Sequence, residues 1–178
     1  NKDVRDLTKD CADALTYLRK KYPGVRFIVL GESAGGYMAT SLGNREILKK
    51  IAPDCAIADG VVDLDGIVDL KGKWRYGIEE NAAVKDAAKI CKEFSPTDCV
   101  SAADAPIYIL HGNADSIVSI GDSRKYARKC ARAGVKAEID ESEGIEHAFI
   151  LFDYAYDNAF VLETLKALTN KILKFFKI

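Results

Sequence analysis

The apolar positions of the chain follow two different periods, and together they predict a layered α/β fold. Apolar residues recur every three or four positions over residues 3–22, which is the spacing of an amphipathic helix, and Pro23-Gly24 ends it. A continuous apolar run follows at residues 26–30, as expected of a strand that is covered on both faces. Strands that alternate with helices in this way favour a parallel sheet flanked by helices.

The remainder of the chain continues the same alternation. The pattern predicts helices at residues 34–42, 82–93 and 119–133, and strands at residues 55–62, 107–110 and 136–140. A terminal helical region is expected over residues 149–176, broken near residues 153–158. No repeat or linker divides the sequence. We therefore expect one domain over residues 1–178, in which the segment 63–104 is the least regular part.

A serine flanked by glycines stands between the first predicted strand and the helix that follows it. Residues 31–35 read Gly-Glu-Ser-Ala-Gly, the G-x-S-x-G pattern of a nucleophile elbow. In such a turn, we expect glycines where a Cβ would collide with the neighbouring strand or helix. The helix N-terminus supplies free N–H groups where an oxyanion would form. The pattern indicates Ser33 as the nucleophile and the Ala34 N–H as an oxyanion donor, although an ordinary turn with a solvent-facing serine has the same pattern.

The chain contains only two histidines, which limits the search for a general base. His147 lies in a polar stretch after the last predicted strand, where a base can reach over the sheet edge to the serine. His111 ends a buried strand, so we expect a structural role for it, with its ring bonded to nearby backbone. Asp115 follows that same strand and suits the acid that orients His147. The alternatives are a turn or N-cap role for Asp115, and Asp122 as the acid.

Three segments together carry a resemblance to a known superfamily. They are residues 22–40, His-Gly-x-x-Asp-x-x-Val at 111–118 and Gly-x-x-His-x-Phe at 144–149. In this order they resemble the α/β-hydrolase superfamily, and most of all the small bacterial carboxylesterases related to hormone-sensitive lipase, dienelactone hydrolase and acetylxylan or feruloyl esterases. Ser95-Pro96 also fits that group, and the resemblance implies that the segment 63–104 is a cap-like insertion over the pocket. The cholinesterase branch shares Gly-Glu-Ser-Ala-Gly-Gly, but there the acid and base lie much farther along the chain.

The resemblance implies a serine carboxylesterase that hydrolyses short-chain, carbohydrate or aryl esters through Ser33, Asp115 and His147. It implies no metal and no organic cofactor, because such a triad needs neither. The candidate substrate contacts are Glu32, Tyr37, Trp74 and Tyr76. The last two of these either line an acyl or aromatic site or simply anchor a long loop.

Two other functions are compatible with the same residues. One is a peptidase or acylaminoacyl hydrolase of the prolyl-oligopeptidase kind, since small members of that branch carry Gly-x-Ser-x-Gly-Gly-Tyr, although they usually have an additional β-propeller. The other is a catalytically impaired hydrolase fragment. Members of the superfamily normally place about four strands and an oxyanion-hole segment before the nucleophile strand. We therefore expect an N-terminally incomplete α/β-hydrolase fold, in which a second copy or a partner segment covers the exposed edge at residues 26–30.

Composition narrows the range of partners. The 178 residues carry 26 Lys and Arg against 27 Asp and Glu, a formal net charge of −1, which gives no electrostatic case for nucleic acid or an anionic membrane. No apolar run approaches the roughly 18 residues of a membrane span. With these two classes set aside, the partner that the resemblance implies is a small-molecule ester. The five cysteines form no metal-binding spacing, and we expect mostly reduced thiols, with a Cys91–Cys99 bridge as the alternative.

Overall fold

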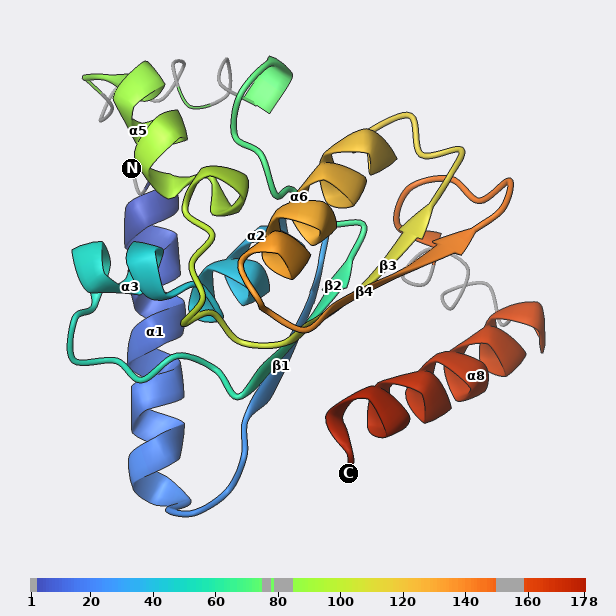
Figure 1. Cartoon of the computed structure of the whole chain (residues 1–178), viewed down its shortest axis with the longest axis horizontal. Coiled ribbons are helices and arrows are strands. Elements are labelled where there is room, and N and C mark those ends of the chain that lie inside the picture. The colour runs from blue at the N-terminus through green and yellow to red at the C-terminus, as the bar shows by residue number, and fades with distance from the viewer. Residues whose placement is uncertain (1–2, 75–77, 79–84, 150–158) are drawn as a thin grey trace.

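The computed structural model describes residues 3–74, 78, 85–149 and 159–178, and Figure 1 shows their arrangement. The elements in chain order are α1 (Val4–Lys21), β1 (Ile28–Glu32), α2 (Ala34–Leu42), α3 (Arg45–Ile51), β2 (Gly60–Leu64), α5 (Ala87–Phe94), the 3-10 helix η1 (Pro96–Asp98), β3 (Ile107–Gly112), α6 (Ile120–Arg132), β4 (Ala137–Ser142) and α8 (Ala159–Phe176).

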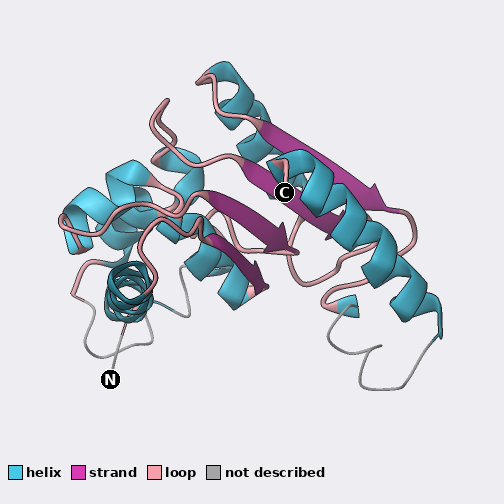
Figure 2. Cartoon of the chain, turned by 90° about the horizontal axis from the view of Figure 1, so that it is seen from below, coloured by secondary structure: helices cyan, strands magenta, loops and turns pink. Residues whose placement is uncertain are grey.

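The four described strands form one parallel sheet in the order β1-β2-β3-β4. One face of the sheet packs against α2 and α6, through a cluster that includes Val61, Ile109 and Tyr126. The opposite face packs against α8, and Tyr108 and Phe175 are among its contacts. Figures 1 and 2 show α8 on the other side of the sheet from these two helices. The predicted parallel sheet with flanking helices is confirmed.

Every strand ends two residues later than the apolar pattern predicts, at Glu32, Leu64, Gly112 and Ser142. The register explains the extension, because the last residues of each strand still pair with the adjacent strand although most of them are polar or glycine. Glu32 lies opposite Leu64, and Gly112 lies opposite Ser142. The predicted strand over residues 55–62 also starts too early, since β2 begins only at Gly60. It continues through Asp63, which is fully buried although it is acidic.

Two helices differ from the prediction. The helix α3 was not predicted at all, because the Gly43-Asn44 signal marks the end of α2 and the start of α3 at once. The Asn44 side chain accepts a hydrogen bond from the Ile47 N–H at 2.9 Å and so caps the new helix. The helix predicted from residue 82 begins at Ala87 as α5, capped by Asp86, and residues 82–84 lie outside the described part. The break predicted near residues 153–158 also falls outside it.

The surface and the cysteines add three observations. Among the described strands, β1 has a single neighbour, and Leu30 on it is 59% exposed. The cysteines form no disulfide, so the bridge considered between Cys91 and Cys99 is absent. None of the described helices has the length and apolar character needed to cross a membrane.

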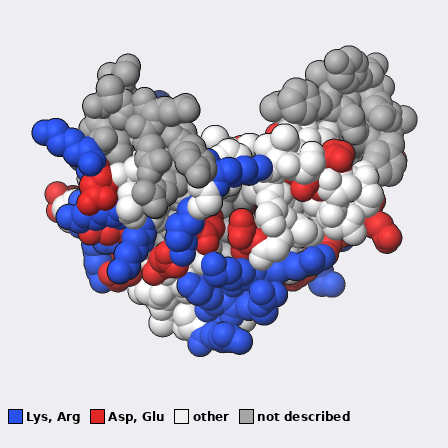
Figure 3. Space-filling model, turned by 90° about the horizontal axis from the view of Figure 1, so that it is seen from above, with Lys and Arg blue, Asp and Glu red and all other residues white. Residues whose placement is uncertain are grey.

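Charged residues of α6 lie among side chains of the opposite sign. Arg124 pairs with Glu141, Lys125 with Asp69, and Lys129 with Asp98. On the face seen in Figure 3, Lys and Arg side chains gather with Asp and Glu beside them. Ion pairs of this kind at the surface contribute little stability individually, and they offset the positive charge of the helix.

Candidate active site

Ser33 occupies a sharp turn between β1 and α2. Its φ of 55° and ψ of −117° lie in a region that residues with a side chain rarely adopt. The turn brings backbone segments close together, because a Cβ on Gly31 would lie 2.0 Å from the Gly35 carbonyl oxygen. A Cβ on Gly36 would lie 2.6 Å from the Gly66 Cα. The expected collision is therefore confirmed at Gly31 but wrong at Gly35, where a Cβ would meet nothing within 4 Å.

The three residues predicted as nucleophile, base and acid lie in one hydrogen-bonded chain. The Ser33 Oγ is 2.9 Å from the His147 Nε2, and the His147 Nδ1 is 2.7 Å from the Asp115 Oδ2. The Asp115 side chain is fully buried, whereas that of His147 keeps 12% exposure. A carboxylate accepts the Nδ1–H, which leaves the Nε2 lone pair free to accept the serine hydroxyl. Asp115, not the alternative Asp122, contacts the base.

Asp115 is held as an ionised carboxylate. Burial raises its pKa, but hydrogen bonds donated by His147 and by the Val118 and Ile117 N–H groups outweigh burial, so the pKa lies below its usual value. The two N–H groups donate to Oδ1 at 2.7 and 2.8 Å. The expected turn role is therefore confirmed, and the same side chain also contacts His147, since Oδ1 accepts from the loop N–H groups and Oδ2 faces the imidazole.

The loop that carries His147 is tied to the loop that carries Asp115 by a residue that the sequence analysis missed. Asp65 follows β2 with a φ of +47° and is 1% exposed. Its two carboxylate oxygens accept hydrogen bonds from the Gly112 N–H at 3.0 Å and from the Ala148 N–H at 3.1 Å. Gly112 opens the loop before Asp115, and Ala148 follows His147. A carboxylate at the carboxyl end of a buried strand was the signal that could have revealed it.

The predicted oxyanion donor, the Ala34 N–H, lies at the start of α2 and directly follows Ser33. Ala34 is the first residue of α2, so its N–H has no acceptor within the helix. The turn itself is fixed by the Ser33 N–H, which donates to the Leu64 carbonyl at 2.9 Å, and by the Ser33 carbonyl, which accepts from Tyr37 and Ile67.

The four candidate substrate contacts fall in different places. Glu32 ends β1 and is half-buried beside Ser33. Tyr37 is 2% exposed, and its hydroxyl donates to the Phe94 carbonyl at 3.2 Å, so it packs in the core and not on an accessible surface. Trp74 is half-buried against the same core cluster. Tyr76 lies outside the described residues.

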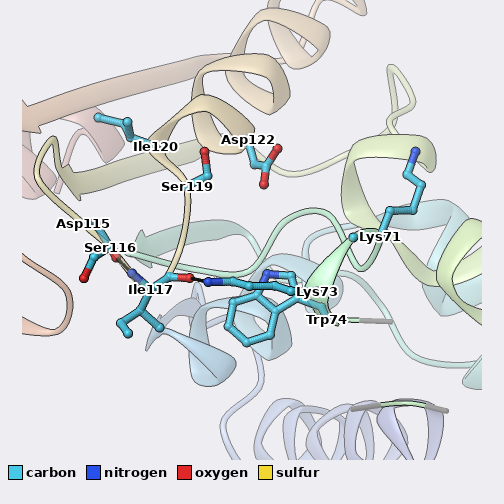
Figure 4. A pocket seen from close by; sticks show the side chains of 10 residues that line it. Lys71, Lys73, Trp74, Asp115, Ser116, Ile117, Ser119, Ile120 and Asp122 are labelled. Atoms are coloured by element: carbon cyan, nitrogen blue, oxygen red, sulfur yellow. Dashed lines mark hydrogen bonds between the residues drawn. The ribbon is translucent and has the colours of Figure 1, made fainter. Parts of the chain in front are cut away.

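Trp74 also lines a cavity of about 470 Å³ beside the loop that carries Asp115, and neither Ser33 nor His147 is among the residues that line it. Figure 4 shows Lys73 lying against the indole ring, with its ammonium 4.9 Å from the ring centroid and bonded to the Ile117 carbonyl. Ser119 and Asp122 line the same cavity. The cavity thus offers one aromatic surface together with hydroxyl, carboxyl and ammonium groups.

Comparisons with known proteins agree with this architecture. The model of the BD-FAE family matches residues 4–130. The structure of the thermophilic esterase Est2 from the planctomycete Thermogutta terrifontis is similar with 25% sequence identity and a TM-score of 0.77, covering 98% of this chain and 65% of that protein. The chain therefore spans about two thirds of the length of that esterase.

Two further solved structures show the same fold at lower identity. An acetyl ester-xyloside bifunctional hydrolase from Caldicellulosiruptor lactoaceticus is 24% identical with a TM-score of 0.67, covering 94% of this chain and 63% of the enzyme. A truncated carbohydrate esterase from gut microbiota is 20% identical with a TM-score of 0.68, covering 97% of this chain and 69% of that protein. None of the curated proteins compared with the chain matches it.

Proposed function

The chain belongs to the BD-FAE family and has an α/β-hydrolase fold, and from this we propose that it is a serine carboxylesterase. The observation that carries the proposal is the continuous chain of hydrogen bonds from Ser33 through His147 to the buried Asp115. The esterases among its structural relatives support a hydrolase.

In the proposed reaction, the Ser33 Oγ attacks the ester carbonyl while the His147 Nε2 takes the hydroxyl proton. The carbonyl oxygen becomes an oxyanion that the Ala34 N–H stabilises. His147 then gives its proton to the departing alcohol, which leaves an acyl group on Ser33. A water molecule, deprotonated by His147, attacks this acyl group and releases the carboxylic acid, and Ser33 regains its proton.

Asp115 acts in every one of these steps without exchanging a proton. Its Oδ2 accepts the His147 Nδ1–H at 2.7 Å, which keeps the Nε2 lone pair directed at Ser33. When His147 carries two protons, the carboxylate stabilises the imidazolium. Because the pKa of Asp115 is lowered, the acid is ionised under conditions where an esterase works.

We propose short-chain esters with a carbohydrate or aryl alcohol as the substrate class. The cavity beside the acid loop supports this choice, because the Trp74 ring offers a flat apolar surface and Ser119 and Asp122 offer hydrogen-bonding groups. The names of two structural relatives, a carbohydrate esterase and an acetyl ester-xyloside hydrolase, point to the same class.

Hydrolysis of p-nitrophenyl acetate by the purified chain tests the proposal. We expect turnover that Ser33→Ala abolishes and that Ser101→Ala leaves unchanged, since Ser101 precedes β3 at the opposite end of the sheet. Equal rates for the wild type and Ser33→Ala would refute the proposed function. A matched anilide of the same acyl group, turned over as fast as the ester, would instead indicate an amide-directed hydrolase.

A further inference from the structure

A second histidine lies directly behind the proposed catalytic acid. His111 belongs to β3 and is completely buried. Its Nε2 lies 3.1 Å from the Val118 carbonyl oxygen and also 3.1 Å from the Asp115 Oδ2. Its Nδ1 lies 2.9 Å from the Ser123 Oγ. The expected bond from this ring to nearby backbone is confirmed, but the ring also contacts the acid itself.

The neighbours of His111 dictate where its ring carries the proton. Nε2 faces a carbonyl oxygen and a carboxylate oxygen, and neither of these can donate a proton. Nε2 must therefore be protonated, and in the neutral ring Nδ1 is left as an acceptor for the Ser123 hydroxyl. His147 needs the opposite tautomer, because its Nδ1 faces Asp115. Both rings thus bring a nitrogen close to the Asp115 Oδ2, which is hydrogen-bonded to the His147 Nδ1 and lies 3.1 Å from the His111 Nε2, while the hydrogen bond of that Nε2 goes to the Val118 carbonyl.

His111 is placed to hold both oxygens of Asp115 in position. It donates to the Val118 carbonyl, and the Val118 N–H donates to the Asp115 Oδ1 at 2.7 Å, so the ring closes the loop that presents the acid. At the same time its N–H dipole lies beside Oδ2, the oxygen that accepts from His147. Rotation of the carboxylate away from His147 would break contacts on both oxygens.

The only group of potential metal ligands in the described residues consists of Asp65, His111 and Asp115, whose donor atoms lie within 4.8 Å of one another. These atoms have internal partners. The Asp65 oxygens accept from the Gly112 and Ala148 N–H groups, and both nitrogens of His111 are engaged. The cluster therefore fits a network of hydrogen bonds that fixes the acid better than it fits a ligand site.

We propose that His111 is a positioning residue for Asp115, with Ser123 fixing its ring. The proposal rests on the proposed esterase function, because it concerns the acid of the same triad. His111 touches neither the substrate nor the reacting atoms. It acts through the orientation of the Asp115 carboxylate, and thereby through the direction in which His147 faces Ser33.

A matched pair of amide substitutions separates this role from general packing. His111→Gln can place an N–H near the position of Nε2, whereas the shorter side chain in His111→Asn reaches only the position of Nδ1. We expect His111→Asn to lower kcat on p-nitrophenyl acetate by about 10- to 100-fold with KM unchanged, by analogy with the loss caused when a residue that orients a metal-bound ligand is replaced. His111→Gln should keep most of kcat. Tyr108→Phe, which removes a hydrogen bond from the same strand to Asp140, is the control and should be neutral.

Nuclear magnetic resonance of histidine labelled with ¹⁵N tests the proposal without any turnover. We expect the two rings of the wild type to be opposite tautomers, with His111 protonated at Nε2 and His147 at Nδ1. The low-field His147 Nδ1–H signal, assigned by its loss in His147→Ala, should broaden in His111→Asn and persist in His111→Gln. If neither variant folds, the wild type alone still tests the proposal, because a His111 ring protonated only at Nδ1 would overturn it.

Three results would overturn the positioning role. They are a His111 ring protonated only at Nδ1, an unchanged kcat in folded His111→Asn, and equal losses of kcat in the two amide variants. A wild type that hydrolyses no ester would refute the proposed function instead. In that case the low-field signal in the variants would still test the positioning of Asp115.

Discussion

Asp63 is a carboxyl group buried in the centre of the sheet, and replacing it with asparagine should remove a pH-dependent loss of stability. Its side chain is fully buried, and it fills the space left by two glycines. A Cβ on Gly36 would lie 2.3 Å from its Oδ1, and a Cβ on Gly66 would lie 1.7 Å from it. Neither oxygen accepts a hydrogen bond of normal geometry from the described residues. Burial, followed by the neighbouring Asp65 carboxylate, raises the pKa of Asp63 to about 7, against a smaller opposite effect of the Gly66 N–H.

The sign and size of the effect follow from the two pKa values of Asp63. Its ordinary value is 3.8 and its folded value is about 7, so between these pH values the unfolded chain releases a proton that the folded chain keeps. Stability therefore falls as pH rises through this window, and it is constant with respect to this group above about pH 7. A difference of about 3 pKa units corresponds to about 4 kcal/mol in total, of which about 2.5 kcal/mol is lost between pH 5 and pH 8.

Urea unfolding of the wild type and Asp63→Asn at pH 5 and pH 8 measures how the contribution of Asp63 to the free energy of unfolding changes with pH. Asparagine has nearly the shape of the protonated acid but cannot ionise. We expect the free energy of unfolding of Asp63→Asn relative to the wild type to rise by about 2.5 kcal/mol from pH 5 to pH 8. Asp54→Asn, at an exposed position, is the control and should follow the wild type. Parallel pH dependence of Asp63→Asn and the wild type would show that the buried carboxyl does not keep its proton.

Four further substitutions test the site. Asp115→Asn should lower kcat about 10⁴-fold with the fold intact, because the amide favours the wrong tautomer of His147; a loss of under tenfold would contradict its role as the acid. Gly31→Ala should lower the melting temperature sharply, whereas Gly35→Ala, with open space at its Cβ, should leave it unchanged or raise stability by about 0.5–1 kcal/mol; equal effects would contradict the elbow geometry. Asp65→Asn leaves one of two backbone N–H groups facing an amide N–H, so we expect a loss of about 1–3 kcal/mol in the free energy of unfolding, which the same urea assay would measure.

Segments with helical spacing of apolar residues alternate with continuous apolar runs, and this was enough to predict most of the strands and helices in their order. The reason is that strands in a parallel sheet covered on both faces are continuously apolar. The same signal placed all four strand ends two residues early. Polar residues such as Glu32 and Asp63 pair with the next strand as well as apolar ones do, since the sheet is held by backbone hydrogen bonds. The helix α3 was missed because Gly43 ends α2 and Asn44, the next residue, already caps α3, so the pair reads as a single helix end.

The residues of the proposed triad could be found from sequence because each stands in a local motif whose residue types are demanded by its chemistry. The supporting residues could not be found in this way. Asp65 contacts Ala148 across 83 positions, and Ser123 contacts His111 across 12, so their roles depend on how the loops meet in space. Trp74 was predicted either to line an acyl or aromatic site or to anchor a long loop. The structure places it against a core cluster and in the wall of a cavity that Asp115 also lines, so its contact with substrate stays a prediction.

Covalent labelling of Ser33 tests the central proposal most directly. The purified chain would be treated with a fluorophosphonate probe, and the adduct would be located by intact and peptide mass spectrometry, with His147→Ala as the control. The account predicts one adduct, on Ser33, whose formation is lost or greatly slowed in His147→Ala. A folded chain that takes up no probe, or one labelled at Ser33 equally fast without His147, would contradict the claim that these residues form a working nucleophile.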